Sequence, residues 1–260
     1  MKRIKATAML AWSSRRAWWF TATSRTKERF ARTALGSFWL GFSNLLSIGL
    51  LATVYGTVFR VNDFGHYVVY LGVGLVGWNA VSSALLSAPN LFRINSTNLK
   101  NTNLHPVFYT LEEWAFQMQT FFQSFALVGA CLSAFKPTIL LGLATAGLLP
   151  VANMMILCYW LPTVICIMGA EFEDFYQLVP IAVQLTFLLS PILYKKEALG
   201  HLGWLAEWNP LYAVIARVRS AAFGEFDIVH DVILLCFNLA GCCLAMIWLD
   251  NARKRLPFLV

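Results

Sequence analysis

Three arginines near the start of the chain have a spacing that gathers charge on one face of a helix. Arg25, Arg29 and Arg32 lie at positions i, i+4 and i+7, which places their guanidinium groups on one helical stripe. Guanidinium groups bind phosphate and carboxylate oxygens strongly, often through two parallel hydrogen bonds. The stripe predicts either anchoring to anionic lipid or direct contact with an anionic substrate head group, and the sequence leaves both interpretations open.

The other residue types that commonly carry chemistry are scattered. Four histidines occur singly, and six cysteines lie inside apolar runs without metal-ligand spacing, so we expect no metal site and no disulfide framework. No His-Asp or paired-carboxylate spacing occurs inside an apolar run. Five acidic residues lie near the ends of such runs: Glu112, Glu113, Glu171, Glu173 and Asp174. An intramembrane transferase, which needs converging polar groups at membrane depth, is therefore a weaker alternative.

The composition is that of a membrane protein. Of 260 residues, 58% are hydrophobic and 13% are charged, and the mean hydropathy is +0.62. Soluble domains carry about 25% charged residues. We expect a polytopic membrane protein whose surroundings are lipid and protein, with no nucleic acid among its partners.

Apolar runs divide the chain into an all-α fold with six transmembrane helices. Residues 1–33 mix basic and aromatic side chains and predict an amphipathic helix in the membrane interface, and residues 34–260 form the six-span domain. The fourth span is too long for one straight crossing, and we expect Pro150 and Pro162 to bend or trim it. The spans are expected at about 35–59, 67–91, 112–135, 139–169, 175–194 and 230–249.

The distribution of Lys and Arg sets the orientation. With the N-terminus inside, fourteen of these residues fall on the inner side and six on the outer side. Cytoplasmic loops carry the excess of positive charge. Both termini are therefore expected in the cytoplasm, and the polar segment 90–105 between spans two and three is expected there too.

The segment after span five predicts a gate at the outer surface. Residues 195–224 contain two apolar pieces, each too short to cross a bilayer, which needs about 20 residues. Span five ends at Ser190-Pro191, and Asn209-Pro210 joins the two pieces. We expect an outer re-entrant helical hairpin, with Pro191, Asn209 and Pro210 as its hinge residues. Three glycines of span two, Gly72, Gly74 and Gly77, suit close packing, either at a dimer interface or within one subunit.

Several motifs in this order resemble the membrane subunit of type-2 ABC exporters for bacterial surface polysaccharides such as O-antigen, capsule and wall teichoic acid. The resemblance covers nearly the whole chain. It is carried by Arg29 to Trp39 (RFARTALGSFW), Lys100 to Pro106 (KNTNLHP), Asp174, Ser190-Pro191-Ile192 with Tyr194, and Trp208-Asn209-Pro210-Leu211. One departure is the acidic patch of Glu171, Glu173 and Asp174, because this family commonly has an arginine beside the aspartate. That patch is either a solvated loop or a salt-bridge partner of the basic N-terminal helix.

The resemblance implies a homodimer in the bacterial inner membrane, with a separate ABC ATPase subunit docked under each copy. This chain has no G-x-x-x-x-G-K-[ST] loop, so ATP and Mg would bind the partner subunit and no cofactor would bind here. Residues 90–105 would be the coupling helix that rests on the ATPase, with Arg93, Asn98 and Lys100 at the contact. An ATP-independent channel or carrier is the remaining alternative, although neither intramembrane charges nor an internal repeat points to it.

The resemblance also implies a path for a lipid-linked polysaccharide. Aromatic rings can stack on the apolar faces of sugars without fixing one pattern of hydroxyls, which suits a sliding polymer. The candidate rings are Phe38, Phe42, Tyr55 and Phe59 on span one, and Phe187 and Tyr194 on span five. The competing interpretation of each ring is an aromatic belt at the membrane surface or a contact with lipid. A lipid carrier with a phosphate group would favour the stripe of Arg25, Arg29 and Arg32.

Overall fold

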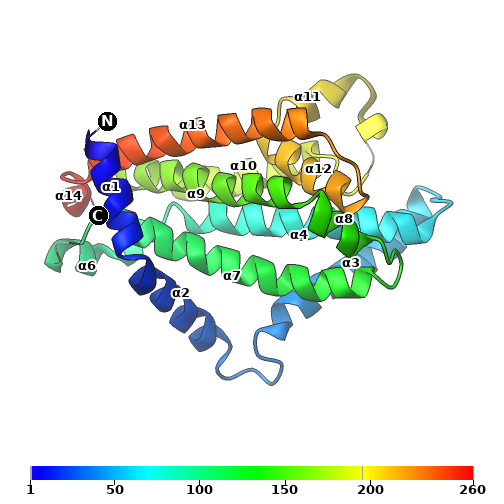
Figure 1. Ribbon diagram of the computed structural model, residues 1–260, viewed down its shortest axis with the longest axis horizontal. Helices are drawn as coiled ribbons and strands as arrows, with labels where there is room; N and C mark the ends of the chain where they lie inside the picture. Colours follow the sequence, from blue (N-terminus) through cyan, green and yellow to red (C-terminus); the bar gives the residue numbers. More distant parts are fainter. Residues whose placement is uncertain (1, 103, 195, 260) are drawn as a thin grey trace.

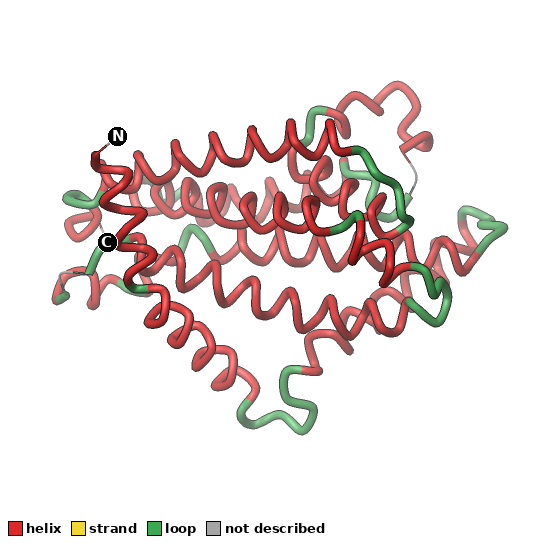
Figure 2. The backbone as a smooth tube through the Cα atoms, in the orientation of Figure 1, coloured by secondary structure: helices red, strands yellow, loops and turns green. Residues whose placement is uncertain are grey.

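The computed structural model describes residues 2–102, 104–194 and 196–259, and these residues form helices and turns without a strand (Figures 1 and 2). This description leaves out Met1, Asn103, Lys195 and Val260. The first three belong to the expected N-terminal, coupling and hairpin segments, respectively. The longer helices are α1 (Lys2–Ser13), α2 (Arg15–Phe30), α3 (Phe38–Val58), α4 (Phe64–Ser87), α7 (Val107–Leu132), α9 (Leu148–Glu171), α10 (Phe175–Leu189), α12 (Pro210–Ala222) and α13 (Ile228–Ala252). The shorter ones are α5 (Leu91–Ile94), α6 (Ser96–Asn101), α8 (Ile139–Thr145), η1 (Lys196–Leu202), α11 (Gly203–Glu207) and α14 (Leu256–Leu259).

The long helices lie side by side in one bundle with two distinct ends. α1, α6 and α14 gather at one end with both chain termini, which we name the terminal end, and α8 and α11 lie at the other, the hairpin end (Figure 1). α4 is the central helix, and α3, α7, α9, α10 and α12 all pack against it. Gly72 and Gly77 of α4 approach Leu132 of α7 and Ile215 of α12. These glycines therefore serve packing within one subunit.

Within the described residues, four helices are long and apolar enough to cross a membrane: α3, α4, α9 and α13. The protein is thus a multi-pass membrane protein, and its all-helical fold agrees with the sequence prediction. Two of the six expected spans fall outside this set. α7 has 26 residues but carries buried Glu113 and Gln117, and α10 has 15 residues, about 22 Å of helix against ~30 Å of hydrocarbon. The count of six spans stays a prediction.

The fourth expected span is divided into two helices, and not at the residues that the sequence suggested. α8 ends at Thr145 and α9 begins at Leu148, so the break falls at Ala146-Gly147. Pro150 lies in the first turn of α9, where a missing backbone N–H costs nothing, and Pro162 lies inside α9 without ending it. The expectation that one of these prolines trims the run is wrong, and a bend at either proline stays a prediction.

The N-terminal segment forms two helices that dock on the bundle. α2 packs along α7, where Ala22 is fully buried against Ala115 and Phe116, while α1 contacts α13. α1 ends at Ser13 and Ser14 separates it from α2, and the hydroxyls of both serines donate to the carbonyl of Leu10. Such local bonds compete with a continuous helix. Residues 2–30 are therefore a bent arm and not one straight helix.

Candidate functional site at the hairpin end

Polar side chains from two helices surround the end of α10. This helix stops at Leu189, and the carbonyls of residues 191–194 have no helical partner. Tyr67 Oη donates to the carbonyl of Leu193 over 2.7 Å. Tyr70 Oη lies 3.2 Å from the carbonyl of Pro191 and 3.0 Å from that of Tyr194. Buried carbonyls without partners are costly, so two tyrosines of α4 stabilise the turn that ends α10.

Arg219 completes this arrangement from α12. Its side chain is 4% exposed, Nη1 donates to the Pro191 carbonyl over 3.0 Å, and Nη2 lies 3.4 Å from the Ile192 carbonyl. The guanidinium carbon lies 3.8 Å from the ring centroid of Tyr70, and burial lowers the pKa of the group. A Cβ on Gly74 would overlap Nη2, which explains why a glycine occurs there. Arg219 thus joins α4, α12 and the end of α10.

Asn209-Pro210 has two roles in this structure. The Asn209 Oδ1 accepts hydrogen bonds from the backbone N–H groups of Leu211 and Tyr212, and Pro210 is the first residue of α12. This is the usual N-terminal cap with a proline after it. The Asn209 amide nitrogen also donates to Ser190 Oγ over 2.8 Å. The predicted hinge residues Pro191, Asn209 and Pro210 therefore lie at one junction, although whether it moves stays a prediction.

A second arginine fixes α12 to the last helix. Arg217 Nε donates to Asp231 Oδ1 over 2.7 Å, and Nη2 reaches Oδ2 over 3.2 Å. This two-point hydrogen bond raises the pKa of the Arg217 guanidinium. Arg217 and Arg219 together hold α12 between α13 and α4, so the hairpin end is anchored on both sides.

A pocket of about 430 Å³ opens beside this junction. Its volume falls in the range of small-molecule sites, roughly 300–1,000 Å³. It is lined by four phenylalanine and tyrosine rings, by the imidazole of α4 and by residues of the α3–α4 connection: Phe59, Val61, Asn62, Asp63, His66, Tyr67, Tyr70 and Tyr194. Tyr55 stacks on Phe59 with 5.7 Å between ring centroids and supports that wall. Aromatic faces beside a carboxylate and an amide can bind a hydroxylated ring.

The six predicted path aromatics do not form one surface. Phe59 and Tyr194 line the pocket and Tyr55 supports it, whereas Phe38 and Phe42 are exposed at the opposite end of α3. Phe187 packs on Trp78 with 5.3 Å between centroids. Phe187 and Tyr194 do not share a helical face, because α10 ends before Tyr194, whose hydroxyl turns back to the Leu188 carbonyl.

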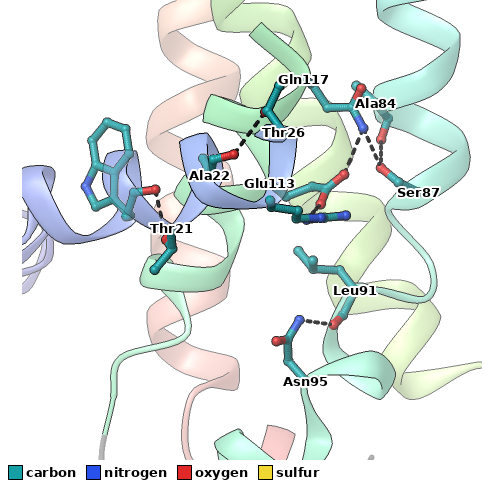
Figure 3. Close-up of polar contacts among 11 residues, drawn as sticks. Thr21, Ala22, Thr26, Ala84, Ser87, Leu91, Asn95, Glu113 and Gln117 are labelled. Atoms are coloured by element: carbon teal, nitrogen blue, oxygen red, sulfur yellow. Dashed lines mark hydrogen bonds and ion pairs between the residues drawn. The ribbon is translucent and has the colours of Figure 1, made fainter. Parts of the chain in front are cut away.

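The arginine stripe is partly used inside the protein. Arg25 Nη1 lies 2.5 Å from Oε2 of Glu113, which is 5% exposed, and the Arg25 guanidinium also lies over the Phe116 ring. Arg29 lies 5.7 Å from the same ring, and Arg32 is exposed. Gln117 donates to Glu113 over 2.8 Å and points toward Ser87 (Figure 3). Arg25 is therefore paired with a buried carboxylate, and Arg32 is open to solvent or lipid head groups.

The expected coupling helix is two short helices, α5 and α6, joined at Asn95. The Asn95 amide donates to the Leu91 carbonyl over 2.9 Å (Figure 3), a local bond that competes with a continuous helix. Phe92 and Leu99 are buried and anchor the segment, whereas Arg93, Asn98 and Lys100 are exposed at the terminal end. The side chains predicted to contact a partner are therefore accessible.

His105 connects the segment of α5 and α6 to the bundle. Its Nδ1 accepts the backbone N–H of Val107 at the start of α7, and its Nε2 lies 3.5 Å from Asp250 of α13. Burial lowers the pKa of this imidazole. The acidic patch of Glu171, Glu173 and Asp174 is exposed, and no ion pair with α2 is seen in the described part of the chain.

Sequence reasoning missed the residues that organise both ends. Arg219 and Glu113 each lie inside or beside an apolar segment, close to a second charge of the same sign, and both are buried. A charge in such a segment costs free energy unless it has a partner. The presence of these charges was therefore the sequence signal for a buried, paired site. Tyr67 and Tyr70 carried no signal of this kind, because their partners are backbone carbonyls far away in the sequence.

Comparison with known proteins gives one family. The family model described as ABC-2 type transporter matches residues 19–223, which includes the helices from α3 to α12. Comparison with curated proteins gives no match.

Proposed function

Because the chain belongs to the ABC-2 type transporter family, we propose that it is the membrane-spanning subunit of an ATP-driven exporter for a lipid-linked polysaccharide, with O-antigen as the first candidate. The polymer moves from the cytoplasmic to the outer side of the bacterial inner membrane. Two copies of this chain form the path, and an ABC ATPase docks under each copy. The termini and the segment of Arg93, Asn98 and Lys100 face the cytoplasm in this proposal.

The pocket at the hairpin end is the observation that supports a sugar substrate. Four aromatic rings, with Asp63 and Asn62 beside them, give stacking faces and hydrogen-bonding groups in a cavity of about 430 Å³. Its wall includes Tyr194, which follows directly on the junction held by Arg219. A sugar unit that enters this pocket therefore lies against the segment between α10 and the hairpin. Movement of that segment would open or close the outer exit.

The experiment measures surface polysaccharide per unit of membrane protein in cells that carry ring-deletion variants. One aromatic contact contributes about 0.5–1.5 kcal/mol. We expect Phe59→Ala or Tyr194→Ala to lower export modestly, and the two together to lower it strongly, with ATPase binding unchanged. Phe258→Ala is the matched control, because this ring is 90% exposed at the terminal end. Normal export by the double variant would remove the pocket from the path.

A further inference from the structure

A row of polar side chains lies inside the bundle, away from the pocket at the hairpin end. On α7 the row contains Glu113, Gln117, Thr120 and Ser124, which fall on one helical face. Asn79, Ser83 and Ser87 of α4 and Asn44 of α3 face the same region. Asn44 lies near the start of α3, and Asn79 and Ser83 lie near the end of α4, so the row belongs to the half of the bundle nearer the terminal end.

Hydrogen bonds form two separate groups within this row. In one group, Asn79 Nδ2 donates to Asn44 Oδ1 over 2.6 Å, and Asn44 Nδ2 donates to Ser124 Oγ over 2.6 Å. In the other, Gln117 Nε2 donates to Glu113 over 2.8 Å and lies 3.4 Å from Ser87 Oγ. A cavity of about 70 Å³ lies between the groups. Its lining is Leu40, Asn44, Val76, Asn79, Ala80, Ser83, Gln117, Thr120, Phe121 and Ser124.

Packing of the helices against one another explains the hydrogen bonds of this row, but it does not explain the cavity between them. Polar side chains commonly join helices in membranes. However, Thr120 Oγ1 donates to the Gln117 carbonyl of its own helix. Ser83 is exposed at the cavity's edge, and its hydroxyl forms no hydrogen bond within residues 2–102, 104–194 and 196–259. These two hydroxyls line the cavity and join no helices, so they are available to a ligand.

The lining selects for a neutral, hydroxylated ligand. Its polar groups are amides and hydroxyls, which both donate and accept hydrogen bonds, and no charged side chain lines the cavity. The carboxylate of Glu113 is turned toward Arg25 and Gln117. A volume of 70 Å³ corresponds to about two water molecules at ~30 Å³ each. Two hydroxyl groups of one sugar would replace two such waters.

We propose that this cavity, which we name the amide pocket, binds two hydroxyl groups of the sugar nearest the lipid carrier as the substrate enters the bundle. The inference rests on the proposed function, since it takes the substrate to be a lipid-linked sugar. The exposed edge at Ser83 gives the sugar access from the side of the bundle. The amide pocket thereby distinguishes a glycosylated carrier from a bare one before transport begins.

The test measures binding to the complex of this chain with its ATPase in nanodiscs. One probe is a polyprenyl diphosphate that carries a single N-acetylhexosamine, and the other is the same polyprenyl diphosphate without sugar. The variant is Ser83→Ala with Thr120→Val, which removes both hydroxyls and preserves shape. Thr53→Val is the matched control, because Thr53 also bonds its own helix and is exposed on α3.

We expect the double variant to bind the glycosylated probe about tenfold more weakly, as the loss of two neutral hydrogen bonds implies. Binding of the bare probe should stay unchanged, and Thr53→Val should behave as wild type. Equal loss for both probes, or no loss for either, would overturn the amide pocket while leaving the proposed export function in place. Phosphatidylglycerol is added as a competitor of the glycosylated probe. If it competes in the wild type but not in the double variant, and sugar binding is unchanged, the amide pocket is also overturned. A wild-type complex that binds neither probe would contradict the proposed function itself.

Discussion

Arg219 Nη1 donates a hydrogen bond to the Pro191 carbonyl over 3.0 Å and so joins α12 to the end of α10. The guanidinium is buried and makes its contacts with backbone carbonyls and the face of Tyr70. The geometry of the hairpin therefore depends on a buried guanidinium charge whose partners are backbone carbonyl dipoles. Such a contact tolerates small shifts in the backbone, because a guanidinium offers five donors in one plane. This property suits a junction beside the exit that we propose.

Replacement of Arg219 should loosen the hairpin end. Arg219→Met keeps much of the side chain's length and apolar contact but leaves the carbonyls of Pro191 and Ile192 without these donors. We expect the free energy of unfolding to fall by about 1–3 kcal/mol. Thermal unfolding in detergent, followed by circular dichroism, measures the change. Arg16→Met, at an exposed position of α2, should leave the melting temperature unchanged, and equal melting of both variants would refute the role of Arg219.

Gly74 should be as sensitive as Arg219 although it carries no side chain. Gly74→Ala places a methyl group where Arg219 Nη2 lies, so the guanidinium must leave its carbonyl partners. We expect a loss of about 1–3 kcal/mol from this overpacking, and reduced export. The control is Gly49→Ala on α3, where a Cβ meets no atom within 4 Å. A stable, active Gly74→Ala protein would show that Arg219 is not fixed at this position.

The docking of α2 should depend on one ion pair. Arg25→Ala leaves Glu113 buried without its cation, and an uncompensated buried carboxylate is strongly destabilising. The Arg25 side chain is 44% exposed, so solvent screens the pair and we expect a loss of about 1–2 kcal/mol. Glu113→Gln should restore most of this loss in the double variant. Arg29→Ala is the control, and proteolysis of α2 in membranes reports its release. No difference between the two arginines would contradict the pairing.

The sequence predicted the class of the protein and the extent of its elements better than it predicted their contacts. Long apolar runs locate α3, α4, α9 and α13, since the bilayer requires such runs. The Asn-Pro pair marked the start of α12 for a local reason, a cap followed by proline. The partners of Tyr67, Tyr70 and Arg219 lie more than twenty residues away in the chain, so no local pattern encodes them. The break at Ala146-Gly147 was missed because the expectation considered only the two prolines of this apolar run.

The orientation of the bundle can be tested by labelling single cysteines in intact cells. After replacement of the native cysteines, His201→Cys should react with an impermeant thiol reagent, and Asn98→Cys should not. Both side chains are exposed, so accessibility differs only by the side of the membrane. His201 is preferred to Gly200, whose φ of +50° strains any other residue. Labelling of Asn98→Cys in intact cells would reverse the orientation and remove the coupling assignment.

The most direct test of the central proposal is transport by the purified complex in proteoliposomes. The assay supplies lipid-linked polysaccharide in the outer leaflet and adds ATP and Mg outside, so that only complexes whose ATPase faces outward are driven. It measures the polymer that becomes protected from an added glycosidase. We expect ATP-dependent movement away from the ATPase side. We also expect loss of that movement when Arg93→Glu and Lys100→Glu are combined, because the exposed coupling segment would then repel its partner. Movement without ATP, or none with a fully loaded and folded complex, would contradict the account.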